Sequence, residues 1–178
     1  MRKLSELAGM PLKWVQPSTV KKHYELRAGD EPVATLQFRS LFGSYAIGAS
    51  AEGRWTFKRV GFWQTRATVR TAGSETEIAS FRNGTWSSGG TLTLADGREL
   101  LATTNFWKSK MVFQDEQQAQ LIQFENHGVL RLSSIVEIRP KAVNMPELPW
   151  IVMLGWYLCI KMSEDSTGAA AGAAAAGS

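Results

Sequence analysis

The residues of this sequence that could recognise a ligand are basic, and they cluster between positions 54 and 70. This stretch contains no aspartate or glutamate and carries Arg54, Lys58, Arg59, Arg66 and Arg70. If residues 61–63 form the loop of a hairpin, Lys58 faces Arg66 across the two strands, and Arg54 faces Arg70. Like charges directly opposite one another are destabilising, and a bound anion such as phosphate would relieve their repulsion.

The alternation of residue types places this charge on one face of the hairpin. Trp55 and Phe57 alternate with Arg54 and Lys58 along the strand, so their side chains point to the opposite face, as residues facing a core do. We therefore expect one outward basic face that binds an anionic group, formed by Arg54, Lys58, Arg66 and Arg70. The alternative is a solvated surface whose long side chains point into water.

Other residues that could do chemistry lack the partners they would need. His23 lies in a basic stretch, His127 lies in an expected turn, and neither belongs to a recognisable catalytic motif. Cys159 lies in an apolar segment. Burial in apolar surroundings raises the pKa of a thiol and makes it unreactive. The sequence contains no GxSxG nucleophile motif and no phosphate-binding glycine loop. These features predict a protein that is not an enzyme and that holds no metal or cofactor.

Length and composition indicate a single folded domain. The chain has 178 residues, of which 44% are hydrophobic, and its net charge is +4. One cysteine excludes an intramolecular disulfide and every zinc site that needs two thiolates. The chain begins without the pattern of a signal peptide, so we expect a reducing, cytoplasmic setting. A pI of about 9.4 is compatible with nucleic-acid binding, but no motif supports it, and nucleic acid is not an expected partner.

Before Pro146 the sequence alternates between strand and turn signals. Asn83-Gly84, Asp96-Gly97 and Asn126-His127-Gly128 are among the expected turns. Strands this closely spaced must be antiparallel, because parallel strands need long crossover connections. The clearest strand predictions are Val33–Phe38, Trp55–Val60, Arg66–Thr71, Glu77–Arg82, Thr91–Leu94, Glu99–Thr104, Lys110–Gln114 and Gln118–Phe124.

A run of uncharged, mostly apolar residues follows, from Leu148 to Ile160, between Glu147 and Lys161. It could form a buried helix, a short membrane anchor or a strand. As a helix it is about 20 Å long, too short to cross a bilayer core of about 30 Å, and no transmembrane span is expected. As a strand it would be unusually long. Pro149 is suited to the first turn of a helix, and a helix that is apolar all round must be buried all round.

A closed antiparallel barrel around this helix accounts for both the closely spaced strands and the apolar segment. The helix is then surrounded by apolar side chains, and the strands have a core to cover. The predicted fold is therefore all-β with one buried helix. We expect one domain over residues 1–166 and a Gly/Ala-rich tail over residues 167–178, which is either disordered or an added segment foreign to the natural protein.

The sequence resembles the tubby C-terminal-like superfamily, which includes tubby-like domains, LURP-one-related proteins and phospholipid scramblases. The resemblance spans Leu12–Met162 and rests on the segments YAIGASAEGRWTFKRVGFW, IASF, GGTLTLADGRELLAT and PWIVMLGWYLCI. It implies a barrel of twelve antiparallel strands around a hydrophobic C-terminal helix. The sequence departs from better-known relatives in having no Pro-rich N-terminal region, no cysteine cluster and no DxDxDG-type acidic loop.

The resemblance also implies a function. Tubby-like domains bind phosphoinositides through basic strand faces, so anionic membrane lipids or phosphorylated ligands are the expected partners. The leading expectation is a non-enzymatic binding module, cytoplasmic and peripheral at the membrane. The alternative is a scramblase-like, membrane-associated protein whose C-terminal helix contacts lipid.

Overall fold

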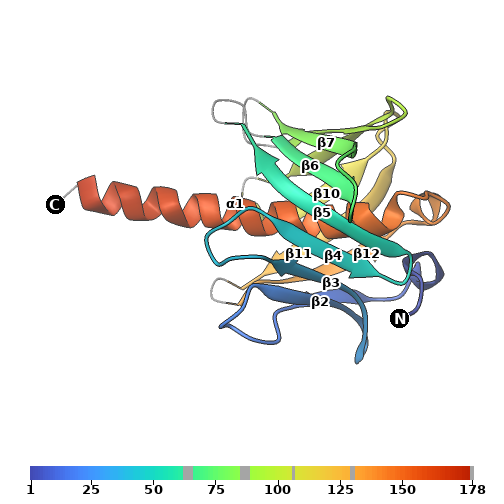
Figure 1. Ribbon diagram of the computed structural model, residues 1–178, viewed down its shortest axis with the longest axis horizontal. Coiled ribbons are helices and arrows are strands. Elements are labelled where there is room, and N and C mark those ends of the chain that lie inside the picture. Colours follow the sequence, from blue (N-terminus) through green and yellow to red (C-terminus); the bar gives the residue numbers. More distant parts are fainter. Residues whose placement is uncertain (62–65, 85–88, 106, 129–130, 177–178) are drawn as a thin grey trace.

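Strands and one long helix make up most of the computed structural model, which describes residues 1–61, 66–84, 89–105, 107–128 and 131–176. The helix α1 runs from Leu148 to Ala176, and two short 3-10 helices are η1 (Leu4–Leu7) and η2 (Pro140–Ala142) (Figure 1). The twelve strands of the described chain are β1 (Leu12–Val15), β2 (His23–Ala28), β3 (Glu31–Phe38), β4 (Ala46–Ser50), β5 (Gly53–Val60), β6 (Arg66–Thr71), β7 (Glu77–Asn83), β8 (Gly89–Leu94), β9 (Glu99–Thr104), β10 (Lys110–Gln114), β11 (Gln120–His127) and β12 (Ser133–Ile138).

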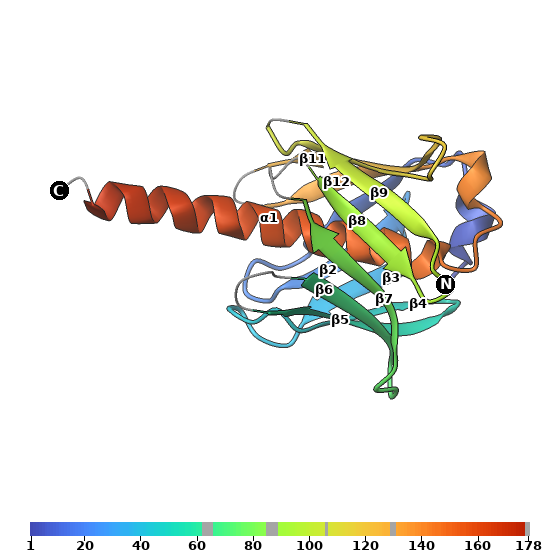
Figure 2. The same cartoon turned by 90° about the horizontal axis from the view of Figure 1, so that it is seen from above.

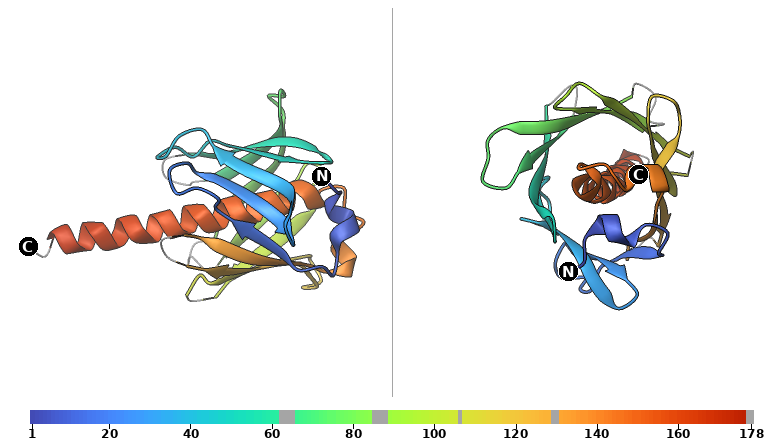
Figure 3. Two further views of the ribbon diagram at one scale, coloured as in Figure 1. Left: turned by 90° about the horizontal axis from the view of Figure 1, so that it is seen from below. Right: turned by 90° about the vertical axis from the view of Figure 1, so that its right-hand side faces the viewer.

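The strands form a closed barrel with the simplest possible order. Each strand pairs antiparallel with its neighbours in the sequence, and β1 pairs with β12 to close the sheet. Viewed along the barrel, the strands encircle α1 (Figure 3). This confirms the predicted all-β fold with a closed antiparallel barrel around a C-terminal helix.

The barrel buries α1 on every side. All residues from Leu148 to Ile160 are buried, which confirms the predicted helix and excludes the strand alternative. Trp156 stacks on Trp14 of β1 with ring centroids 6.0 Å apart. On another side, Tyr157 stacks on Phe38 of β3 and Phe57 of β5, at 5.6 and 5.9 Å. The aromatic residues of several strands thus provide the apolar surroundings that this helix requires.

The C-terminal part of the helix differs from the prediction. We expected the helix to end near Lys161 and residues 167–178 to form a separate tail, but α1 continues through the Gly/Ala-rich stretch to Ala176. Lys161 is instead the point where the helix leaves the core, and the following turns project beyond the strands (Figures 1 and 2). Alanine has the highest helix propensity, which explains the continuation. Among the described residues, no helix combines the length and the apolarity needed to cross a bilayer.

The two ends of the barrel are built differently. At one end, here called the cap end, η1 and η2 lie beside the start of α1, and Leu4, Leu7 and Ala142 are fully buried. At the other end, the exit end, polar contacts tie the helix to the strand connections. The Tyr157 hydroxyl donates a 2.7 Å hydrogen bond to the carbonyl oxygen of Ser44, and Lys22 pairs with Glu164. These contacts fix the direction in which the helix emerges.

One strand lies two or three residues later than predicted. We expected a strand over Gln118–Phe124 and a turn at Asn126-His127-Gly128, but β11 runs from Gln120 to His127. The Asp115 side chain accepts hydrogen bonds from the backbone N–H groups of Gln117 (3.0 Å) and Ala119 (2.9 Å). This local turn holds the backbone out of the sheet and delays the start of the strand.

Candidate anion-binding face

The predicted basic residues share one surface of the barrel. Arg54 and Lys58 lie on β5, Arg66 and Arg70 lie on β6, and the two strands are paired. The alternate residues of β5, Trp55 and Phe57, point inward with exposures of 8% and 0%. The predicted parity is therefore confirmed, and all four basic side chains are on the outer face.

The predicted pairing within this hairpin is wrong by two residues. Lys58 lies opposite Thr68, and Arg70 lies opposite Thr56, so the two like-charged pairs expected between β5 and β6 do not form. The cause is the length of the connection: five residues, 61–65, separate the strands where we expected a loop of three. Positions 62 and 63 of the expected loop, and the two residues after it, lie outside the described residues. A shift of two keeps the parity, which is why the four residues still share a face.

Two of the four basic residues are paired with acids of the next strand or of the connection that leads to it. Arg66 Nη1 lies 3.2 Å from a carboxylate oxygen of Glu77 on β7. Arg70 lies 2.7 Å from Glu75 and 3.3 Å from Glu77. The sequence between positions 54 and 70 lacks acids, but the fold brings these acids alongside. Arg66 and Arg70 are therefore engaged within the protein.

Arg54 and Lys58 are in a different position. Both side chains are exposed, and within the described residues neither forms an ion pair. They lie four residues apart on the same side of β5, a spacing of about 13 Å along the strand. These two residues are the part of the predicted face that is free to bind an anion.

An outer groove begins at Arg54 and crosses the neighbouring strands. It has a volume of about 380 Å³, and its outward-facing lining comes from β3, β4, the connection between them and β5: Thr35, Gln37, Arg39, Tyr45, Ile47, Ala49 and Arg54. Thr35, Ala49 and Arg54 form one row across the three strands. Because Ala49 has only a methyl group, a hollow remains between its two larger neighbours. This hollow is part of the groove, and we call the whole groove the outer groove.

The charge of the outer groove comes from Arg39 and Arg54. The nearest carboxylate in the strand register is that of Glu25, opposite Thr35 on β2. Glu25 is already paired with Arg27, which donates to the same carboxylate oxygen at 2.9 and 2.6 Å. Arg39 therefore joins Arg54 as an exposed guanidinium without an ion pair among the described residues.

This arrangement suits a phosphate or carboxylate group. A guanidinium presents planar paired donors that match such oxygens, and it stays charged at any physiological pH. Thr35, Gln37 and Tyr45 add hydroxyl and amide donors along the same groove. The chemistry available here is recognition of an anion.

Most residues of the outer groove were not predicted from the sequence. Thr35, Gln37 and Arg39 alternate in the segment VATLQFR, so their shared outward parity was visible in the sequence. Their proximity to Arg54 depends on the register of two strand pairs, which alternation alone does not specify.

The remaining reactive groups lie elsewhere. Cys159 is buried in α1, and burial raises the pKa of its thiol to about 12. His23, which follows Lys21 and Lys22 in the basic stretch, is the first residue of β2, and its Nε2 lies 3.6 Å from a carboxylate oxygen of Glu25. His127 is exposed at the end of β11. No group of three or more metal-ligating side chains is found within the described part of the chain.

Comparison with known proteins identifies the fold. No family model matches the sequence, and no curated protein matches it. A solved structure of a protein from Arabidopsis thaliana is similar over 92% of this chain and 96% of that chain, with a TM-score of 0.56 and 10% sequence identity. At this identity the similarity shows a common fold.

Proposed function

We propose that this protein is a non-enzymatic binding module that holds anionic lipid head groups, or another polyanion, against the outer surface of its barrel. The observation that carries the proposal is the outer groove, in which Arg39 and Arg54 face solvent without acidic partners among the described residues. Lys58 extends the same basic surface along β5.

The electrostatics of this surface limit its affinity. Attraction to an anionic lipid surface contributes about 1 kcal/mol per nearby basic residue, or about 3 kcal/mol for Arg39, Arg54 and Lys58 together. That alone is weaker than millimolar binding, so hydrogen bonds within the outer groove must supply the rest. Binding should weaken with added salt, because exposed charges are screened over about 8 Å at physiological ionic strength.

The fold supports this proposal. A barrel of twelve strands around a C-terminal helix is the architecture that the resemblance to the tubby C-terminal-like superfamily implies. Membership of that superfamily, and a peripheral location at a cytoplasmic membrane surface, belong to the same proposal. The rigid strands of the barrel hold the binding side chains, which reduces the conformational entropy lost on binding.

The test compares two pairs of basic residues on the same hairpin. The double variant Arg54→Gln/Lys58→Gln removes the two unpaired charges of the hairpin and leaves Arg39 in place. The matched control Arg66→Gln/Arg70→Gln removes the same amount of charge from paired residues. Sedimentation with phosphatidylserine vesicles and binding of soluble inositol hexakisphosphate are measured for both. We expect the first variant to lose at least tenfold in affinity for each probe and the control to lose less. Equal binding by the first variant and the parent would overturn the proposal.

A second candidate is a scramblase-like function, and the projecting part of α1 is the observation that favours it. This segment leaves the barrel after Lys161 and would be available to contact lipid (Figure 1). The two functions differ in a measurable way. A scramblase would move fluorescent lipid between the leaflets of a vesicle, whereas a binding module would attach to the vesicle and leave its lipid asymmetry intact.

A further inference from the structure

The connections at the exit end of the barrel have an unusual composition. In a closed up-and-down barrel, the connections that follow odd-numbered strands all lie at one end, and here that is the end where α1 emerges. Their sequences contain no aspartate or glutamate, and they contain Lys21, Lys22, Arg39, Lys108 and Arg131. The described residues of these connections are 16–22, 39–45, 61, 84, 105, 107–109, 128, 131 and 132, and we call them the exit rim.

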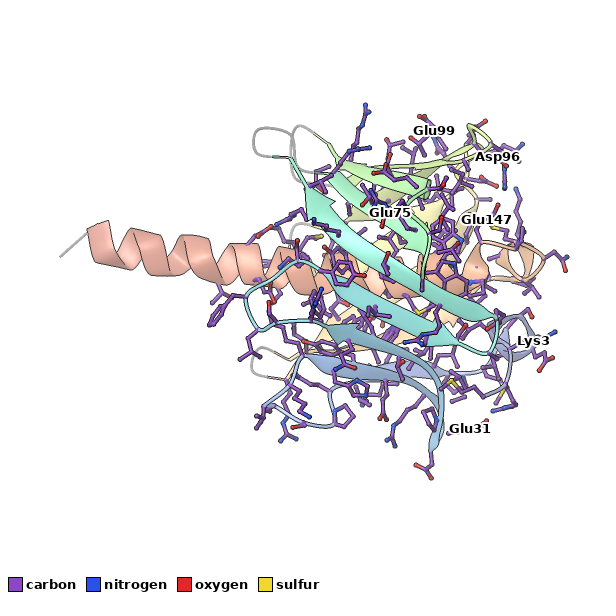
Figure 4. All side chains as sticks on the ribbon, viewed as in Figure 1. Lys3, Glu31, Glu75, Asp96, Glu99 and Glu147 are labelled. Atoms are coloured by element: carbon purple, nitrogen blue, oxygen red, sulfur yellow. The ribbon has the colours of Figure 1, made fainter. Side chains whose placement is uncertain are left out.

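The cap end has the opposite composition. Asp96 and Glu147 lie at the end away from the projecting helix (Figure 4). The connections there carry three basic residues, Arg98, Arg139 and Lys141, against a larger number of acidic residues: Asp30, Glu52, Glu75, Asp96, Asp115, Glu116 and Glu147. The N-terminal segment beside η1 adds Arg2, Lys3 and Glu6 to this end, and acidic residues still outnumber basic ones there. The two ends of the barrel therefore differ in charge, and the exit rim is the more positive end.

Large apolar side chains are also exposed on the exit rim. Phe42 is 98% exposed, Trp107 is 81% exposed and Val20 is 77% exposed, and the three lie on separate connections. Leu41 beside Phe42 is also exposed. Single exposed apolar residues are normal on protein surfaces, but here they share one end of the molecule with the basic residues.

The acids that α1 brings to this end are neutralised. Glu164 pairs with Lys22 and Lys161, and Asp165 receives two hydrogen bonds from Arg59 at 3.0 and 2.7 Å. Lys21 and Arg131 form no ion pair among the described residues, nor do Arg39 and Lys108. The positive charge of the exit rim is thus available to an external partner.

We infer that the exit rim is a membrane-contact surface that docks end-on against an anionic lipid bilayer. A bilayer has its negative charge at the phosphates and its apolar region just beneath them. Exposed apolar tips such as Phe42 and Val20, with basic residues beside them, match these two layers. Because the apolar groups lie on separate connections around a ring, they suit a broad, soft surface. The inference rests on the proposed lipid ligand and adds the surface and orientation of binding.

The projecting helix is compatible with this orientation. It points in the same direction as the exit rim, and the sequence beyond Asp165 contains no charged residue. Residues 167–176 extend about 15 Å as a helix, about half the thickness of a bilayer's hydrocarbon core. Its backbone hydrogen bonds are made within the helix, as contact with lipid requires.

The orientation can be tested with an environment-sensitive label at either end of the barrel. In a Cys159→Ala background, Phe42→Cys places a thiol on the exit rim, and Met10→Cys places one near the cap end, where Met10 is 41% exposed. Each thiol carries an NBD fluorophore, and vesicles of phosphatidylserine and phosphatidylcholine are added. We expect a blue shift and a rise in intensity at position 42 and no change at position 10. Equal responses, or a response at position 10 alone, would overturn the inference.

Two unlabelled variants separate this inference from the proposed function. Phe42→Ser/Val20→Ser removes apolar tips, and Lys21→Gln/Arg131→Gln removes charge from the exit rim. Because all four side chains are on surface connections, thermal unfolding should be unchanged. We expect each variant to lose about tenfold in vesicle affinity and to bind inositol hexakisphosphate as the parent does.

The outcomes for the two ideas differ. If the rim variants bind vesicles as the parent does while Arg54→Gln/Lys58→Gln does not, the inference fails and the proposed function stands. If the rim variants lose vesicle binding while the groove variant binds both probes normally, the proposed function of the groove fails and the exit rim remains the contact surface. A parent protein that ignores anionic vesicles would overturn the inference outright.

Discussion

Gly155 of α1 lies directly beneath the ring of Phe124 on β11. A Cβ atom at this position would fall well inside van der Waals contact with Cζ and Cε2 of Phe124, and 3.1 Å from Cε2 of Phe113. Phe124 is completely buried, and its ring packs edge-on against that of Phe113, so it has little room to move. The glycine therefore marks a close approach between the wall of the barrel and the helix.

The first prediction concerns this close approach. Gly155→Ala should destabilise the protein by about 2 kcal/mol, because overpacking at contacts this short costs about 3 kcal/mol and the better helix propensity of alanine offsets about 1 kcal/mol. Gly168→Ala is the matched control on the same helix, since a Cβ there meets nothing within 4 Å. Urea unfolding should show a loss for the first variant and no loss for the second. A Gly155→Ala protein as stable as the parent would contradict the close packing.

The second prediction tests the enclosure of the helix. Leu154→Asp places an unpaired carboxylate in the apolar core, where Leu154 is 0% exposed, and should abolish cooperative folding. Leu154→Ala should be folded but less stable by about 2–5 kcal/mol. Leu101→Asp makes the same chemical change on the outside of β9, where Leu101 is 41% exposed, and should remain folded. Circular dichroism during thermal unfolding distinguishes the three, and a cooperatively folding Leu154→Asp protein would refute the enclosed helix.

The third prediction concerns Cys159. Burial raises the pKa of its thiol to about 12, so almost no thiolate exists at neutral pH, and the side chain is also shielded from reagents. In native buffer the thiol should react with DTNB only as fast as the protein unfolds, and it should react at once in denaturing urea. Rapid reaction in native buffer would mean that α1 leaves the barrel.

The fourth prediction is a loss of stability at alkaline pH. Burial, with a smaller contribution from the charge of Glu164, raises the pKa of Tyr24 from 10.0 to about 12, and burial also raises the pKa of Tyr157. These groups and Cys159 hold their protons more tightly in the folded state. Their contribution to stability is complete below about pH 9, the ordinary pKa of a thiol, and is lost as the pH rises toward the folded values.

The size of this alkaline effect can be measured. Each such group should lower the free energy of unfolding by about 1.4 kcal/mol per pH unit over the range in which only the unfolded state has lost the proton. Urea unfolding between pH 8 and pH 12 should therefore show a steep decline. The variant Tyr24→Phe/Cys159→Ala should decline less steeply, and parallel slopes would rule out these residues as the source.

The fold was largely predictable because two physical patterns point to it together. Closely spaced alternating strands must be antiparallel, and a helix without a polar face, such as Leu148–Ile160, must be enclosed. Gly155 fits the same enclosure: a glycine in mid-helix is costly unless a close contact requires it, and Phe124 makes such a contact. The alanine-rich continuation of α1 was missed because its composition suggested a linker.

The candidate site was less predictable because it depends on residues from different hairpins. Parity correctly placed Arg54 and Lys58 outside the barrel, since it needs only the alternation along one strand. The pairing of Arg70 with Glu75 and Glu77 was missed because these acids lie beyond the turn that follows β6. The hollow between Arg39 and Arg54 required the register of three strands, and a loop two residues longer than expected is enough to change a register.

The position of α1 at the end of the barrel's sequence determines when the molecule can fold. Ribosomes release a chain from its N-terminus, so all twelve strands emerge before the helix that fills them. The strand that closes the sheet against β1 is β12. Leu12 therefore cannot pair with Val136 until β12 has been synthesised. Until Leu148–Ile160 are synthesised, the inward apolar faces have nothing to pack against. The barrel should therefore close only after translation has passed the helix, and until then the apolar faces of the nascent strands are open to aggregation.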